Sequence, residues 1–113
     1  MIKNDFLFLE HILESLLKIE KYTMNISYDT FLEDTLIYDG VVRNFEIIGE
    51  ASKNISNDFK NNHNSIPWKS LTGMRNILIH EYWGLDSIAI WDTIKFDLPN
   101  LKENIILLLN DKK

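Results

Sequence analysis

Apolar residues recur at intervals of three and four along this 113-residue chain, and no alternating apolar–polar pattern runs for more than a few residues. This spacing places apolar side chains on one face of an α-helix, whereas a half-buried strand needs a spacing of two. The pattern is clear between Asp5 and Tyr22, where charged residues separate Phe6, Leu9, Leu13, Leu16 and Leu17. The sequence therefore predicts an all-α fold of four or five helices, in a single domain spanning residues 1–113.

Capping and breaking residues divide the chain into these helices. Ser27 is a suitable N-cap for a short helix that includes Phe31, and a longer helix follows to about Ile55. Gly40 and Gly49 lie inside the longer helix, where each glycine costs roughly 1 kcal/mol relative to alanine. We therefore expect a neighbouring helix to pack closely against these two positions.

The second half of the chain contains one predicted loop and three predicted helices. Residues 54–65 are rich in Asn, Ser and Lys and predict the loop. Pro67 suits the first turn of a helix that extends to His80 or Tyr82, because that turn needs no N–H there. Pro99 is expected to break or kink the apolar segment that follows, with Asp97 capping a final helix.

Composition limits the classes of function. The chain has no cysteine, which excludes disulfides, thiolate metal sites and thiol redox chemistry. It has no stretch approaching the roughly 18 apolar residues of a membrane span, and its first residues do not resemble a signal peptide. We therefore expect a soluble, cytoplasmic protein that does not interact with membranes.

The net charge of −5 argues against an extended nucleic-acid surface, because phosphate contacts require Lys and Arg. The charge is unevenly distributed, since residues 58–84 carry three basic and two acidic side chains. Any contact with RNA is therefore expected to be local, in this segment, and sensitive to salt.

That segment holds the candidate site. Arg75, Asn76, His80 and Tyr82 interrupt an otherwise apolar helix. At 100° per residue Asn76 and His80 share a face with Gly73, but Arg75 and His80 lie about 140° apart on a straight helix. For both to act on one phosphate, the arginine must wrap round the helix, the helix must distort near His80, or a second subunit must complete the site. Gly73 would let the helix of a second copy approach.

Such a cleft is suited to cutting RNA without a metal. His80 can exchange a proton with a ribose 2′-hydroxyl or a leaving oxygen, and Arg75 can hold the phosphate and stabilise its charge. Asn76 can orient the histidine or bind a phosphate oxygen, and Tyr82 can stack on a base or donate to the phosphate. Because the 2′-hydroxyl is the nucleophile, such an enzyme cuts RNA and not DNA.

Other polar residues are weaker candidates. Glu46 and Glu50 share a helical face and have the spacing of a metal or acid–base pair, but no matching His or Asp accompanies them, which favours salt bridges. His11 and His63 lack ligand-like neighbours and are expected to be solvated. The three tryptophans are most simply core or interface residues, although Trp83 beside Tyr82 also offers a stacking surface.

The spacing Arg75-x-x-x-x-His80-x-Tyr82 resembles the signature of HEPN-domain proteins, and the flanking residues resemble the HepT branch, the toxin half of HepT/MntA toxin–antitoxin pairs. The resemblance covers most of the chain from Phe31 to Leu109. It rests on four further segments: residues 42–51 (VRNFEIIGEA), residues 66–68 (IPW), Ile90-Trp91 and residues 97–101 (DLPNL).

The resemblance implies a homodimeric, up-and-down HEPN-type bundle with metal-independent endoribonuclease activity and no cofactor. It implies that Arg75 and His80 are catalytic, that Asn76 and Tyr82 support them, and that RNA is the substrate. It further implies a type VII-like toxin whose MntA-like nucleotidyltransferase antitoxin transfers AMP to Tyr82, with assemblies beyond the dimer when the antitoxin is bound. The alternative is a non-catalytic HEPN module that binds RNA, nucleotide or a nucleotidyltransferase partner, which the acidic net charge favours.

Overall fold

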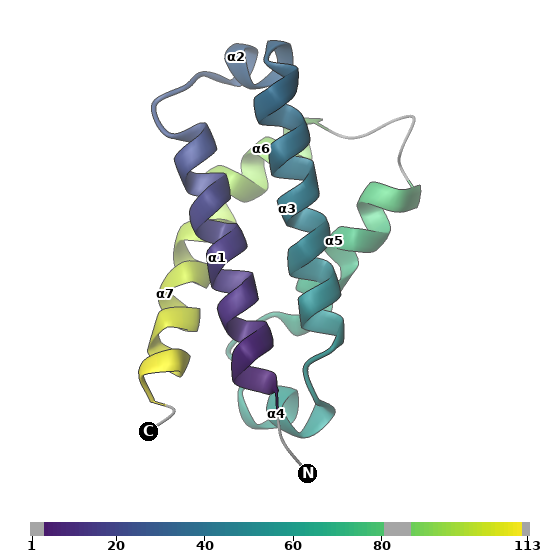
Figure 1. Cartoon of the computed structure of the whole chain (residues 1–113), viewed down its shortest axis with the longest axis vertical. Coiled ribbons are helices and arrows are strands. Elements are labelled where there is room, and N and C mark those ends of the chain that lie inside the picture. The colour runs from purple at the N-terminus through teal and green to yellow at the C-terminus, as the bar shows by residue number, and fades with distance from the viewer. Residues whose placement is uncertain (1–3, 81–86, 112–113) are drawn as a thin grey trace.

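Four long helices form the body of the molecule, which a computed structural model describes for residues 4–80 and 87–111, without the side chains of residues 75–80. Seen in Figure 1, successive long helices run up, down, up and down along the longest axis. The described residues include no strand, so the predicted all-α, up-and-down bundle is confirmed. The four helices are α1 (Asp5–Thr23), α3 (Thr35–Lys53), α5 (Trp68–His80) and α7 (Leu98–Asn110).

Shorter helices connect the long ones: α2 (Tyr28–Glu33), α4 (Asn57–Asn62), α6 (Ser87–Asp92) and the π-helix η2 (Thr93–Asp97). The predicted cap of α2 is confirmed, because the Ser27 hydroxyl accepts a hydrogen bond from the Thr30 N–H at 3.1 Å. The prediction of a plain loop over residues 54–65 was wrong, since α4 lies within it. Ser56 caps α4, and the ring of Phe59 packs edge-on against Phe6 at 5.4 Å, so tertiary packing stabilises a helix there.

The core lies where α3 packs against α1 on one side and α5 on the other, while α7 covers α1. Among the described residues, eighteen apolar side chains are buried, and the largest fully buried one is Phe31. The predicted close approach at Gly40 is confirmed: a Cβ at this position would lie 3.1 Å from the Tyr22 ring of α1. Gly49 is also buried. None of the described helices is long and apolar enough to cross a membrane.

The chain from α6 to α7 is continuous helix with a π turn in the middle. Pro99 has no N–H, and its ring clashes with the carbonyl four residues earlier in a regular α-helix. The chain meets this constraint with η2, where the Leu98 N–H donates to the Thr93 carbonyl five residues back. The α-helical hydrogen-bonding pattern is therefore interrupted just before Pro99, as predicted, although the chain stays helical there. The prediction that Asp97 caps the last helix was wrong, because the chain enters α7 already helical and the Asp97 side chain makes no capping bond.

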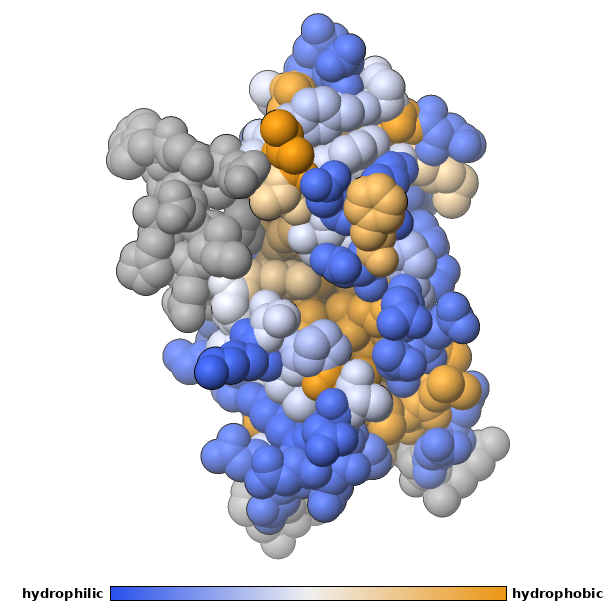
Figure 2. Space-filling view, turned by 180° about the vertical axis from the view of Figure 1, so that it is seen from behind, coloured by the Kyte–Doolittle hydropathy of each residue, from blue (hydrophilic) through white to orange (hydrophobic). Residues whose placement is uncertain are grey.

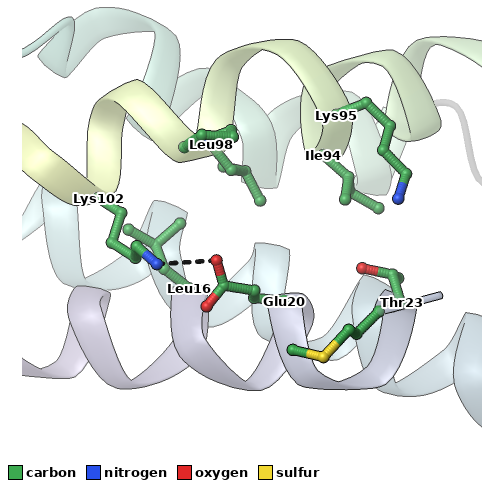
Figure 3. A pocket seen from close by; sticks show the side chains of 9 residues that line it. Leu16, Glu20, Thr23, Ile94, Lys95, Leu98 and Lys102 are labelled. Carbon is green, nitrogen blue, oxygen red and sulfur yellow. Dashed lines mark hydrogen bonds and ion pairs between the residues drawn. The ribbon is translucent and has the colours of Figure 1, made fainter.

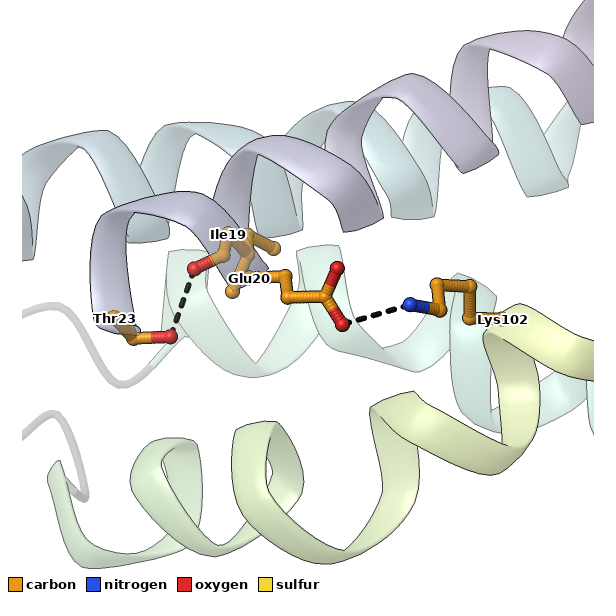
Figure 4. A network of polar contacts seen from close by, with 4 residues as sticks. All are labelled: Ile19, Glu20, Thr23 and Lys102. Atoms are coloured by element: carbon orange, nitrogen blue, oxygen red, sulfur yellow. Dashed lines mark hydrogen bonds and ion pairs between the residues drawn. The ribbon is translucent and has the colours of Figure 1, made fainter. Parts of the chain in front are cut away.

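A polar contact joins the outer pair of helices. The Lys102 ammonium on α7 donates to the Glu20 carboxylate on α1 at 2.8 Å, and one turn further along α1 the Thr23 hydroxyl donates to the Ile19 carbonyl, also at 2.8 Å (Figure 4). The ion pair is half-exposed, so solvent screening limits it to at most about 1 kcal/mol. Apolar burial, not this pair, holds α7 in place.

A buried carboxylate joins the start of α1 to the start of α4. Asp5 is 7% exposed, and its two carboxylate oxygens accept from the backbone N–H and the hydroxyl of Ser56, both at 2.8 Å. Ser56 is also the N-cap of α4, so one side chain positions two helix ends. Charge-assisted bonds of this kind are stronger than neutral ones.

We expect Asp5→Ala to lower the free energy of unfolding by about 1–3 kcal/mol, because it leaves the Ser56 donors unpaired in a partly buried position. Asp5→Asn should cost less, since its amide still offers an acceptor to the Ser56 N–H. Urea denaturation measures both. The control is Glu14→Ala, an exposed position on the same helix, and an equal loss for Glu14→Ala and Asp5→Ala would contradict the assignment.

Candidate functional site

The first turns of α5 are firmly anchored, and the motif residues follow on the same helix. The Trp68 ring is 8% exposed, and its indole N–H donates to the His63 carbonyl at 2.9 Å. Ile66 and Leu71 are almost completely buried beside it. Pro67 immediately precedes the helix, and its carbonyl accepts the Leu71 N–H at 3.1 Å. Apolar burial thus fixes where the motif helix begins.

A hydroxyl pair joins α5 to α3. Ser52 on α3 is fully buried, and its Oγ lies 3.1 Å from the Thr72 Oγ1 and 3.5 Å from the Trp68 carbonyl oxygen. A buried hydroxyl needs a hydrogen-bond partner, and Thr72 meets Ser52 only when α5 has this rotation about its axis and this position along α3. Arg75 and Asn76 lie about one helical turn beyond this fixed point, and His80 lies about two turns beyond it.

The structure places Arg75, Asn76 and His80 on the last turns of α5, whose α-helical backbone is described through His80. Their side chains, and the whole of Tyr82, lie outside the described residues. There are three ways of bringing Arg75 and His80 together. The backbone between them is regular α-helix, so the helix is not distorted before His80. The two other ways are an arginine side chain that wraps round the helix and a second subunit that completes the site.

Gly73 lies on an open part of α5. A Cβ built on it meets no heavy atom within 4 Å in the described part of the chain. Unlike Gly40, it is therefore not required by packing within the bundle. By helical spacing, Gly73 shares this face of α5 with the backbone positions of Asn76 and His80.

The chain beyond the motif is fixed again at Ser87. The Tyr38 hydroxyl on α3 lies 2.9 Å from the Ser87 Oγ at the start of α6. Trp91, on the next turn, packs against Phe31 at 5.1 Å and Tyr28 at 5.9 Å between ring centroids. In the chain, Tyr82 thus lies between α5, which packs on α3, and α6, whose first residue Ser87 is hydrogen-bonded to Tyr38 of α3.

The other candidate residues behave as structural groups. Arg43 lies 3.9 Å from Glu46, which confirms a salt bridge for that glutamate. His11 is exposed as predicted, but His63 is only half-exposed, because its ring packs against Phe59 at 4.4 Å between centroids. No group of three or more His, Asp or Glu side chains suited to a metal occurs among the described residues.

A separate pocket of about 280 Å³ lies between α1 and the η2–α7 junction (Figure 3). Its floor is apolar, formed by Leu16, Ile94 and Leu98, and its rim carries Glu20 together with Lys95 and Lys102. Lys102 is paired with Glu20, and the Lys95 ammonium lies 4.6 Å from the centroid of the Trp91 ring. No residue of α5 lines this pocket, so it is not part of the candidate site.

An all-helical domain with Arg75 and His80 on its third long helix, and a tyrosine two residues further along the sequence, has the features of the HEPN superfamily. The comparison with family models agrees: residues 12–108 match the model described as "Ribonuclease HepT-like". The chain belongs to the HepT-like ribonuclease family.

Curated relatives have similar descriptions. The chain is 48% identical to "Probable ribonuclease HepT" of Thermococcus cleftensis, over 84% of this chain and 86% of that protein. It is 44% identical to a "Putative RNase" of Methanocaldococcus jannaschii, over 87% of this chain and 90% of the relative. A longer protein of the same organism, "Gamma-glutamylcyclotransferase and putative RNase", is 42% identical over 98% of this chain, which spans only 50% of that relative. No solved structure matches the chain.

We expect Gly73→Trp to leave the helical circular dichroism unchanged, because the Cβ position is open, and to convert a dimer into a monomer by filling the approach face. Light scattering at micromolar concentration measures the change. Asp92→Trp, at an exposed position on α6, is the control and should remain dimeric. A wild-type chain that is already monomeric would contradict the predicted dimer.

Proposed function

We propose that this protein is a metal-independent endoribonuclease and the toxin of a type VII-like toxin–antitoxin pair, acting in the cytoplasm. The observation that carries the proposal is the complete Arg75-x-x-x-x-His80-x-Tyr82 sequence in a HepT-like chain, with Arg75 and His80 on the firmly anchored helix α5. The names of the relatives support ribonuclease activity at the level of the family.

In the proposed reaction the ribose 2′-oxygen attacks the adjacent phosphorus and the bond from phosphorus to the 5′-oxygen breaks. His80 accepts the 2′-hydroxyl proton or gives a proton to the leaving 5′-oxygen. Arg75 binds the non-bridging oxygens and stabilises the negative charge that grows on them. Asn76 orients the histidine or binds a phosphate oxygen, and Tyr82 stacks on a base or donates a hydrogen bond to the phosphate. The products carry a 2′,3′-cyclic phosphate and a 5′-hydroxyl, and no cofactor is consumed.

The active unit in this proposal is a homodimer. On the regular helix of α5, positions 75 and 80 lie about 140° apart around the axis, so one copy does not readily present Arg75 and His80 to one phosphate. A twofold axis beside Gly73 would bring two copies of α5 together and place arginine and histidine from different subunits in one cleft. The open space at Gly73 supports this arrangement.

The proposed regulator is an MntA-like nucleotidyltransferase that transfers AMP from ATP to the Tyr82 phenol oxygen and releases pyrophosphate. The new phosphodiester adds negative charge next to Arg75 and competes with the substrate phosphate. Tyr82 follows His80 by two residues, so the modification falls at the cleft. Complexes with the antitoxin then extend beyond the dimer.

A second candidate function is a non-catalytic HEPN module that binds RNA, nucleotide or the nucleotidyltransferase. The net charge of −5 favours it, since electrostatic attraction to RNA is weak. Cleavage of RNA by purified protein separates the two candidates.

We expect Arg75→Ala and His80→Ala each to reduce RNA cleavage by at least about 100-fold, because each removes a group that acts on the transition state. Cleavage by the wild type should persist in EDTA and leave cyclic phosphate ends, measured by gel electrophoresis and mass spectrometry. Mixing the two inactive variants should restore part of the activity if subunits exchange and the cleft is composite. Activity that disappears with EDTA, or that survives in His80→Ala, would rule out this mechanism.

We expect Tyr82→Phe to remain folded and toxic while escaping neutralisation by the enzymatic activity of the antitoxin, because only the phenol oxygen is removed. Intact mass spectrometry after co-expression with the nucleotidyltransferase should show added AMP on the wild type and none on Tyr82→Phe. Tyr22→Phe, on α1, is the matched control and should still be modified. AMP on residues other than Tyr82 would refute the assignment.

A further inference from the structure

A second hollow of about 410 Å³ lies between α5 and the η2–α7 junction, directly before the motif. Its floor is apolar and comes from both sides, with Leu71 of α5 facing Leu98 and Leu101 of α7, all three buried. It opens on the face shown in Figure 2, where apolar surface is visible in the central hollow between polar projections. Its volume lies within the usual range of small-ligand sites.

Phe96 lies at the edge of this hollow and is 76% exposed. Exposing so large an apolar ring to water is unfavourable and therefore unusual. It is the fourth residue of the π-helix η2, whose neighbours Ile94 and Leu98 point into the core. The wider π turn therefore keeps the core residues inside while it directs Phe96 outward. Single π turns occur frequently at functional sites.

The rest of the rim is polar and almost uncharged. Ser65 and Ser70 line one side, and Asn100 and Asn104 line the other, so hydroxyl and amide groups of both donor and acceptor type surround the apolar floor. Among the described residues that line the hollow, Asp97 is the one acidic or basic side chain, and its carboxyl group makes no helix-capping bond. An aromatic ring beside uncharged hydrogen-bonding groups is the combination that binds unpaired nucleobases.

The hollow and the motif lie on one helix. Met74, which lines the hollow, immediately precedes Arg75. At 1.5 Å per residue, Ser70 and His80 are about 15 Å apart along the axis of α5. A single strand of RNA that passes His80 therefore reaches the hollow within a few nucleotides.

We propose that this hollow binds one unpaired base of the RNA substrate, stacked on Phe96 and read at its Watson–Crick edge by Asp97 and the asparagine side chains. The proposal rests on RNA being the substrate, as argued above. A carboxylate accepts two hydrogen bonds from guanine, one from N1–H and one from the 2-amino group, whereas adenine, cytosine and uracil each offer one donor group at this edge. The site therefore prefers guanine to the other three bases at one position near the cleavage point.

The test measures the affinity of His80→Ala protein, which does not cut the probe, for fluorescein-labelled hexauridylate and for versions with one A, C or G at each position in turn. Fluorescence anisotropy should show the tightest binding for guanine at one position. Adding Phe96→Ala should weaken binding of the preferred probe about tenfold, the loss of one stacked base, while Phe96→Tyr retains it. Adding Asp97→Asn should remove the preference for guanine.

Leu107→Ala is the matched control, because Leu107 is an apolar side chain on α7 that is 60% exposed but does not line the hollow. Equal affinity in Phe96→Ala and Leu107→Ala would overturn the proposal, as would a Phe96→Ala chain that becomes monomeric in light scattering, since the hollow would then be a contact between copies. If the wild type cleaves RNA but Phe96→Ala does not weaken RNA binding, only this inference is overturned and the proposed nuclease stands. Base-selective binding that depends on Phe96, in a chain that does not cut RNA, supports the inference and refutes the nuclease. Absence of both binding and cleavage overturns both.

Discussion

The burial of α3 between α1 and α5 is the constraint on which the rest of the fold depends. A helix that packs against two neighbours needs large apolar side chains to fill the core and small residues where a neighbouring helix comes close. Helix α3 has both. Val41, Phe45 and Ile48 fill the core, while Gly40 leaves room for the Tyr22 ring. Because Ser52 then bonds to Thr72, the same helix also fixes where α5 begins and how it is rotated. The motif is positioned through α3, not through its own sequence.

Much of this architecture could be predicted because it follows from local patterns. The three- and four-residue periodicity, the cap at Ser27 and the glycine at position 40 each have one physical explanation, and the structure agrees with them. The failures came from interactions between distant residues. Nothing near Phe59 indicates that Phe6 and Trp68 will pack around it, yet that packing stabilises α4. Similarly, Asp97 has the composition of a cap, but it does not cap because η2 continues the helix through it.

The candidate site shows the same division. Residue types and spacing select Arg75, Asn76, His80 and Tyr82 as candidates, because proton transfer and phosphate binding require groups of those kinds, and their roles stay a prediction. Sequence alone does not reveal the hollow in front of the motif, since Leu71 and Leu98 are distant in the chain and both read as ordinary core residues. Phe96 likewise fits an apolar helical pattern, and only the extra residue of the π turn shows that it is excluded from the core.

The π turn also has a consequence for how this chain tolerates change in length. A π turn holds one residue more than an α turn, so the register of α7 relative to α6 depends on the number of residues in a single five-residue segment. Loss of one residue there would turn the π turn into a regular α-helical turn and bring the Pro99 ring against the carbonyl four residues earlier. Substitutions in Thr93–Asp97 alter one contact at a time, whereas a one-codon deletion would remove the π turn itself. The segment is therefore free to vary in composition at its exposed positions but is fixed in length.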